Sequence, residues 1–342
     1  MDKRLILAVA GSGKTTFLVN QIDYTRRYLI VTYTNNNLNN LRNKIIRKFG
    51  YLPNNVLLLS YFQFLWTICY SPYLKDRCKA KGITFLNPPQ YTIFRPNTKS
   101  FYMTSNGFLY SNRIAKLCQQ YDLCKLIANR IDKYFDCFYF DEVQDLAGHD
   151  FNFALNIIPE NTDVLFVGDF YQHTFDTSRD GNLNKGLYDN YKRYCKKWIT
   201  VGFSIDTESL SKSYRCSPSV CTYVQNYLGI RIESHRSEES LIVFVDQQLD
   251  TDELVTRGLP FLFFRNRNKY LCNGMNWGET KGLDTFEDVA IVLHSDALIK
   301  YRNNMLNLLA SETKNKLYVA CTRARGNIYF IPYNFMECYK KC

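Results

Sequence analysis

Residues 8–16 read Ala-Val-Ala-Gly-Ser-Gly-Lys-Thr-Thr, a loop of small residues that ends in a lysine and two hydroxyl side chains. The apolar run at 4–9 predicts a buried strand before the loop, and residues 16–22 predict the first turns of a helix. A strand, a glycine-rich loop and a helix N-terminus in this order surround a phosphate group with backbone N–H groups. The generic pattern begins with glycine, where this chain has Ala8. The loop therefore predicts a nucleoside triphosphate site.

Each side chain of the loop has an expected role at that site. Lys14 is expected to reach the β- and γ-phosphates, and the Thr15 hydroxyl is expected to ligate Mg²⁺. The other residues predicted to contact the nucleotide are Ala10, Gly11, Ser12, Gly13 and Thr16.

A second motif completes this chemistry. The apolar run at 135–140 predicts a strand, and two adjacent carboxylates, Asp141 and Glu142, follow it. Asp141 is expected to hold Mg²⁺, and Glu142 is expected to take a proton from the water that attacks the γ-phosphate. Together the two motifs predict hydrolysis as well as binding.

Composition favours a polyanionic partner. The chain has 342 residues with 43 Lys and Arg against 32 Asp and Glu, a formal charge of +11. Nucleic acid is the commonest partner of such a basic protein, although the same charges also serve simply to solvate a surface. The twelve cysteines contain no C-x-x-C pair, which favours reduced thiols over a zinc site. No apolar stretch reaches the roughly 18 residues of a membrane helix, so we expect a cytoplasmic protein without a membrane partner.

The remaining pattern predicts an α/β fold with mainly parallel sheets in two domains. Strands are expected at 28–33, 56–59 and 163–169 in the first half, and at 241–245, 260–264, 288–293 and 328–331 in the second. A helix is expected over 317–325, ended by Gly326. The predicted domains are 1–203, with a small subdomain inserted at 71–113, and 204–342.

Eight motifs occur in one order along nearly the whole chain. They are Ala-Val-Ala-Gly-Ser-Gly-Lys-Thr at 8–15, Thr-Tyr-Thr-Asn at 32–35, Ser-Tyr-Phe-Gln-Phe at 60–64, Asp-Glu-Val-Gln-Asp at 141–145, Val-Gly-Asp-Phe-Tyr-Gln at 167–172, Ser-Tyr-Arg-Cys at 213–216, Lys-Gly-Leu-Asp at 281–284 and Tyr-Val-Ala-Cys-Thr-Arg-Ala-Arg at 318–325. In this order they resemble the UvrD/Rep-type superfamily 1 DNA helicases, in the compact phage and bacterial form that lacks the large insertion in the second domain.

The resemblance implies two RecA-like P-loop domains with the ATP site in the cleft between them. It implies ATP and Mg²⁺ as cofactors and single-stranded DNA as the partner, with 3′→5′ movement in DNA replication or repair. Gln172 would contact the γ-phosphate, and Arg215 and Arg323 would act as arginine fingers. Tyr214 would stack on adenine, Asp284 would lie beside the ribose, and Gly282 would be a further nucleotide-binding residue. The positions implied to touch the strand are Thr34, Asn35, Tyr61, Phe62 and Phe175.

The selectivity for ATP and three alternative functions stay open at this point. Relatives carry an arginine that sandwiches adenine where this chain has Thr16, so the selectivity for ATP is open. The chain could be an ATPase subunit that translocates but unwinds only with a protein partner, or a nucleotide-switched module of a repair or defence complex. It could also act on RNA, because none of the motifs reads the 2′-hydroxyl.

Overall fold

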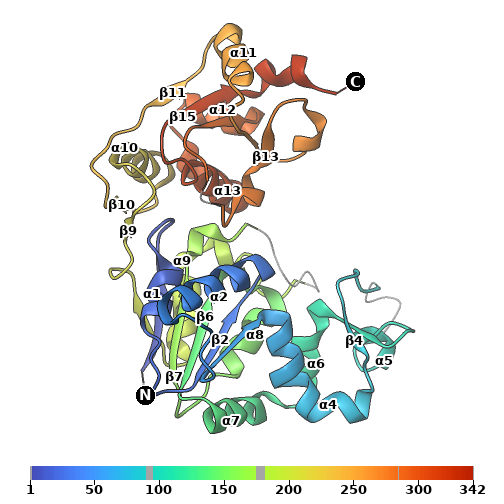
Figure 1. Cartoon of the computed structure of the whole chain (residues 1–342). Coiled ribbons are helices and arrows are strands. Elements are labelled where there is room, and N and C mark those ends of the chain that lie inside the picture. The colour runs from blue at the N-terminus through green and yellow to red at the C-terminus, as the bar shows by residue number, and fades with distance from the viewer. Residues whose placement is uncertain (1, 90–94, 175–181, 284, 342) are drawn as a thin grey trace. The chain divides into compact units, whose positions relative to one another are not determined.

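The computed structural model of the chain describes residues 2–89, 95–174, 182–283 and 285–341. The chain forms two compact units, coloured mainly blue to green and yellow to red in Figure 1. The first unit comprises Met1–Leu7, Lys14–Gly168 and Phe175–Asp206, and the second comprises Ala8–Gly13, Asp169–Thr174 and Thr207–Cys342. Both contain a parallel sheet with helices. The predicted α/β class with mainly parallel sheets is confirmed, and it is consistent with two RecA-like domains.

The first unit is built on a six-stranded parallel sheet with the order β3-β2-β6-β7-β1-β8. All five residues of β2 and of β6 are buried, as expected for central strands that are covered on both faces. A single strand, β7, separates β1 from β6. The strands are β1 (Lys3–Leu7), β2 (Tyr28–Thr32), β3 (Val56–Ser60), β6 (Cys137–Asp141), β7 (Asp163–Gly168) and β8 (Ser204–Asp206).

Helices connect these parallel strands, because a parallel pair needs a crossover. They are α1 (Lys14–Asn20), α2 (Asn35–Phe49), α3 (Tyr61–Phe64), the π-helix η1 (Leu65–Tyr70), α4 (Ser71–Cys78), α5 (Lys99–Tyr102), α6 (Ile114–Gln120), α7 (Cys124–Tyr134), α8 (Gly148–Asn156) and α9 (Tyr191–Thr200). Between α4 and α6 the chain forms a separate parallel pair, β4 (Gly82–Thr84) with β5 (Phe108–Tyr110). The buried Arg113 guanidinium supports this segment by donating to the carbonyl oxygens of Phe101 (2.6 Å) and Pro89 (3.0 Å).

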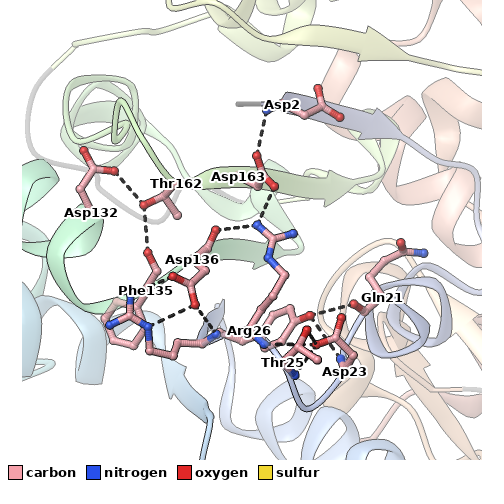
Figure 2. A network of polar contacts seen from close by, with 12 residues as sticks. Asp2, Gln21, Asp23, Thr25, Arg26, Asp132, Phe135, Asp136, Thr162 and Asp163 are labelled. Atoms are coloured by element: carbon pink, nitrogen blue, oxygen red, sulfur yellow. Dashed lines mark hydrogen bonds and ion pairs between the residues drawn. The ribbon is translucent and has the colours of Figure 1, made fainter.

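An ionic network joins the amino ends of four strands of the first sheet (Figure 2). Arg26 donates to Asp163 Oδ2 at 2.6 Å and to the Asp136 carbonyl oxygen at 3.0 Å. Arg27 Nη2 and Nε contact the two oxygens of Asp136 at 2.8 and 3.1 Å, and the Asp2 backbone N–H donates to Asp163 at 3.0 Å. We call these five residues the amino edge. They lie at the end of the strands opposite to Asp141, so they stabilise the sheet without taking part in the site.

The amino edge predicts how stability depends on pH. The Arg27 guanidinium lowers the pKa of Asp136 from about 3.8 to about 2. Since the folded pKa is the lower one, the stabilisation is present above pH 4 and is lost as the pH falls toward 2. The Asp136 side chain is 36% exposed. Solvent screening therefore reduces the expected cost of Asp136→Asn to about 1 kcal/mol at pH 7.

Urea unfolding of the wild type and Asp136→Asn at pH 7 and pH 2.5 measures this effect. The difference between the two proteins should shrink at the lower pH. Asp76→Asn is the control, because Asp76 is an exposed residue of α4 outside the network. If Asp136→Asn lowered the free energy of unfolding equally at both pH values, the Asp136–Arg27 ion pair would not be the source of the stabilisation.

The second unit contains a five-stranded parallel sheet with the order β11-β15-β14-β12-β13 and a separate pair, β9 with β10. The predicted strands of this half are confirmed. The elements are β9 (Lys212–Ser213), α10 (Pro218–Tyr223), the π-helix η6 (Val224–Leu228), β10 (Glu233–Ser234), β11 (Ile242–Phe244), α11 (Gln248–Thr256), β12 (Phe261–Phe263), β13 (Gly274–Asn276), β14 (Val289–Leu293), α12 (Ser295–Arg302), α13 (Ser311–Cys321) and β15 (Ile328–Pro332).

The helix predicted over 317–325 is α13, which begins and ends earlier, at Ser311 and Cys321. The Arg323 side chain helps to explain its end. The Arg323 backbone N–H donates to the Ala320 carbonyl oxygen at 3.2 Å instead of to that of Val319, which accepts Arg323 Nε at 3.3 Å. The side chain thus satisfies a carbonyl group that a backbone N–H would bind in a continuing helix. Within the described part of the chain, no helix is long and apolar enough to span a membrane.

Candidate nucleotide-binding site

The glycine loop follows β1 and leads directly into α1. Gly11 and Gly13 have φ values of +71° and +83°, in the left-handed region that glycine adopts without strain. A Cβ atom on Gly11 would lie 2.6 Å from Ser213 Oγ and 2.8 Å from Arg215 Cβ. The buried Ser12 hydroxyl donates to the Val9 carbonyl oxygen at 2.8 Å and tightens the loop. The first N–H groups of α1 have no partner within the helix, so they are available to a phosphate.

The first unit brings the helix after the loop to the carboxylate that ends β6. The Thr15 hydroxyl donates to Asp141 Oδ2 at 3.2 Å. Asp141 is 1% exposed, and among the described residues its Oδ1 has no hydrogen-bond partner. Burial and the Glu142 carboxylate raise the pKa of Asp141 to about 7, against the opposite effects of Lys14 and Thr15. An unpartnered carboxylate oxygen beside a threonine hydroxyl suits a divalent cation, so Thr15 and Asp141 fit Mg²⁺.

Glu142 has a backbone conformation that is rare for a residue with a side chain. Its φ is +61°, in the left-handed region, directly after the end of β6. The Gln144 amide donates to Glu142 Oε2, and Gln144 is fully buried. A Cβ on Gly168 would lie 2.5 Å from Gln144 Oε1, so the glycine leaves room for that amide. Gln144 therefore orients Glu142, a role that the sequence analysis did not assign.

A chain of hydrogen bonds within the second unit runs from the glycine loop to α13. The Ala10 backbone N–H donates to the Tyr318 hydroxyl oxygen at 2.9 Å, and that hydroxyl donates to Asp169 Oδ2 at 3.0 Å. The side-chain amide of Gln172 donates to the same oxygen at 3.0 Å, and Gln172 is buried. Burial and the Asp169 carboxylate raise the pKa of Tyr318, which keeps its hydroxyl protonated. Sequence analysis singled out Gln172 but neither Asp169 nor Tyr318.

The two predicted arginine fingers lie in the second unit and contact backbone carbonyl groups. Arg323 is 2% exposed, and its Nη1 donates to the carbonyl oxygens of Leu283 (3.1 Å) and Thr280 (3.4 Å). Arg215 Nη1 donates to the Thr322 carbonyl oxygen at 3.0 Å. Gly282 has a φ of +83° in the turn that Arg323 contacts. The predicted ribose contact, Asp284, lies outside the described residues.

Tyr214, the predicted adenine-stacking residue, is 65% exposed and already has one stacking neighbour. The His235 ring lies parallel to it, with 4.0 Å between the ring centroids and an interplanar angle of 13°. The Tyr214 backbone N–H donates to the Gly11 carbonyl oxygen at 2.9 Å, which places this ring beside the glycine loop. His235 is thus a further candidate residue of the site. His235 is 21 residues away from Tyr214 along the sequence, so no local pattern indicated that the two rings stack.

The residues predicted to touch a nucleic acid strand differ in their exposure. Asn35 is exposed at the start of α2, and the Thr34 hydroxyl accepts the Asn37 backbone N–H at 3.1 Å as the helix cap. Tyr61 is 1% exposed, beneath Tyr33 with 5.6 Å between the ring centroids. Of Tyr61 and Phe62, therefore, only Phe62 reaches the surface, and Tyr61 packs beneath Tyr33 and Phe62. Phe175 lies outside the described residues.

An aromatic residue that sequence analysis missed lies against Phe62. The Phe85 ring is 4.9 Å from that of Phe62 at an angle of 89°, and Phe85 is 70% exposed. Tyr33 completes the group, with 5.7 Å between its ring and that of Phe62. Its exposure and its contact with Phe62 are properties of the folded chain, so the sequence carried no signal for Phe85.

The solved structures that are similar to the chain include three of viral helicases. The PRRSV helicase structure has 15% sequence identity and a TM-score of 0.48, and the match covers 97% of this chain and 52% of that one. Arterivirus nonstructural protein 10 (helicase) in complex with DNA has 15% identity and a TM-score of 0.49, with coverages of 96% and 60%. The same helicase without DNA has 15% identity and a TM-score of 0.47, with coverages of 96% and 59%.

The chain thus spans between half and three fifths of the length of these helicases. No protein-family model and no curated protein matches the chain.

Proposed function

We propose that the chain is an ATP-dependent DNA helicase or single-strand translocase of the UvrD/Rep type, which couples ATP hydrolysis to 3′→5′ movement. The observation that carries the proposal is the contact of the Thr15 hydroxyl with buried Asp141, next to Glu142 and the glycine loop. This set of groups matches what nucleoside triphosphate hydrolysis requires, namely a phosphate cradle, metal ligands and a base.

In this proposal the loop N–H groups and the Lys14 ammonium bind the phosphates. Thr15 and Asp141 would hold Mg²⁺, which neutralises phosphate charge when bound. Glu142, oriented by Gln144, accepts the proton of the attacking water. Its carboxylate suits this role because Glu142 directly follows Asp141, the residue that contacts Thr15.

We further propose that residues of the second half complete the nucleotide site. Tyr214, backed by His235, is the stacking surface for the base, with Gly282 and Asp284 toward the ribose. Gln172, Arg215 and Arg323 are the proposed γ-phosphate contacts. The proposed domains are 1–203, with an insertion at 71–113, and 204–342.

For the nucleic acid we propose contacts at the carboxyl ends of β2 and β3. Thr34 and Asn35 would bind the backbone there, because the start of α2 presents N–H groups and polar side chains. Phe62, supported by Tyr61, would stack on a base together with Phe85. Phe175 remains a proposed contact by resemblance. The formal charge of +11 favours such a polyanionic strand.

Steady-state ATP hydrolysis with single-stranded DNA, with single-stranded RNA and without either polymer tests the proposal. We expect stimulation by DNA, and Lys14→Ala should lower every rate by at least about a hundredfold because it removes a phosphate contact. Lys192→Ala, an exposed change in α9, is the matched control. If only RNA stimulates hydrolysis, the proposed substrate becomes RNA instead of DNA. If neither polymer stimulates hydrolysis, the proposed helicase or translocase activity is wrong, and a nucleotide-switched module is favoured.

Movement and unwinding need separate measurements. Displacement of streptavidin from a biotinylated strand end reports translocation, and opening of a forked duplex reports unwinding. Streptavidin displacement without fork opening would favour a translocase that unwinds only with a protein partner.

A further inference from the structure

One edge of the second unit's sheet is open to another strand. Among the strands of the described residues, β11 is the outer one and pairs only with β15, in parallel. The Leu241 carbonyl oxygen accepts the Ile328 N–H at 2.9 Å, and the Val245 N–H donates to the Phe330 carbonyl oxygen at 3.0 Å. Backbone groups alternate in direction along a strand, so those of Ile242 and Phe244 point away from β15. Such a row of outward N–H and C=O groups is a template for strand pairing.

The two faces of this edge differ in character. On one face Leu241 is 64% exposed and Val243 is 37% exposed, although both are apolar. On the other face Ile242 lines a groove of about 420 Å³ with residues of α10 and η6. Figure 1 shows β11, β15 and α10 as neighbouring labelled elements of this unit. A strand added to β11 would therefore place alternate side chains on Leu241 and Val243 and in the groove.

The groove combines aromatic rings with a carboxylate. The Tyr223 and Tyr227 ring centroids are 4.7 Å apart, and Tyr227 is 37% exposed. Tyr223 is 7% exposed and its hydroxyl oxygen is buried, so Tyr223 supports Tyr227 and offers no hydrogen-bonding group to the groove. Glu239 lines the same groove and accepts a hydrogen bond from the Ser219 hydroxyl. The neighbouring Glu238 does not line the groove, and its carboxylate forms an ion pair with Arg236 at 3.1 Å.

These groups match the side chain of an arginine. A guanidinium stacks on tyrosine rings, and its N–H donors can pair with a carboxylate at the same time. A partner of opposite charge in the groove would face Glu239, whereas an acidic side chain would be repelled by it. The negative charge of the groove also stands out against the chain's overall charge of +11.

We propose that β11 and this groove form a docking site for an extended segment of a partner protein. The segment adds as a strand to β11, places an arginine in the groove, and places apolar or β-branched residues on Leu241 and Val243. Main-chain hydrogen bonds to the outward groups of Ile242 and Phe244 supply affinity, and the arginine supplies specificity. This interaction goes beyond the proposed helicase or translocase activity and does not depend on it.

Selection from a displayed library of random twelve-residue peptides on the full chain tests the site. Counter-selection uses the Glu239→Gln, Tyr227→Ala double variant. We expect peptides in which one arginine stands between apolar or β-branched residues at alternate positions. Fluorescence anisotropy of a selected peptide should show binding at least tenfold weaker after replacement of that arginine by alanine. N-methylation of the amides that face β11 should weaken binding by a similar factor.

Matched variants separate the groove from general surface effects. Glu239→Gln and Tyr227→Ala should each weaken binding at least fivefold. Glu238→Gln and Tyr333→Ala should leave it unchanged, since Tyr333 is exposed to a similar extent, 40%, but does not line the groove. Failure to enrich any peptide overturns the proposal. Binding that is insensitive either to Glu239→Gln or to amide methylation overturns it equally, and neither result bears on ATP hydrolysis.

Discussion

Glu142→Gln is expected to slow ATP hydrolysis by about 100- to 10,000-fold while nucleotide binding is kept. Loss of a positioned general base typically has an effect of this size. The glutamine has nearly the same shape, so the left-handed backbone at residue 142 and the contact with Gln144 face no steric change. Steady-state turnover and titration with a fluorescent ATP analogue measure the two quantities separately.

The control for this variant is Glu160→Gln, because that side chain is 75% exposed in the same unit. It should change neither turnover nor nucleotide affinity. Turnover retained by purified Glu142→Gln would remove Glu142 from the mechanism and leave the hydrolysis step without an assigned base.

Gly11→Ala is expected to weaken nucleotide binding by about a hundredfold. A left-handed conformation costs an alanine about 1–2 kcal/mol, and overpacking adds about 1–3 kcal/mol. The new Cβ would lie 2.8 Å from Arg215 Cβ and 2.6 Å from Ser213 Oγ. Rotation of that hydroxyl would not relieve the contact freely, because it accepts the N–H groups of Arg215 (3.2 Å) and Cys216 (3.0 Å). A total of about 3 kcal/mol corresponds to this loss of affinity.

Gly50→Ala separates the cost of the left-handed backbone from the cost of the close contact at Gly11. Gly50 has a φ of +82°, similar to that of Gly11, but nothing lies within 4 Å of a Cβ built on it. We expect Gly50→Ala to lower the free energy of unfolding by about 1 kcal/mol and to leave nucleotide affinity unchanged. Equal effects of the two alanines on nucleotide affinity would show that the close contact at Gly11 is unimportant.

The parallel sheets could be predicted because their strands are short, apolar and bounded by polar turns. β2 and β6 are buried throughout, so their continuous apolar runs stand out in the sequence. The position of Asp141 could be predicted as well, since a carboxylate that ends a buried strand lies at the carboxyl edge of the sheet. The helix α13 was placed correctly in part, and its end depends on a side-chain hydrogen bond that periodicity does not encode.

Partners that are distant along the chain could not be predicted. The Ala10 N–H and the Tyr318 hydroxyl are 308 positions apart, and only the folded chain brings them together. The stacking of His235 on Tyr214 and the pairing of Gln144 with Glu142 depend on backbone turns with no periodic signal. Exposure is equally hidden: Tyr61 and Phe62 are adjacent and aromatic, yet only Tyr61 is buried.

The amino edge has a consequence for combining mutations. Asp136 and Glu142 flank the five residues of β6 and are separated by about 20 Å at the usual rise per residue. Free-energy changes at sites more than about 7–10 Å apart usually add. A substitution that strengthens the network around Arg26 and Asp163 should therefore offset, by simple addition, the instability caused by a change at Glu142. The amino edge is the place to introduce stabilising mutations before the catalytic residues are varied.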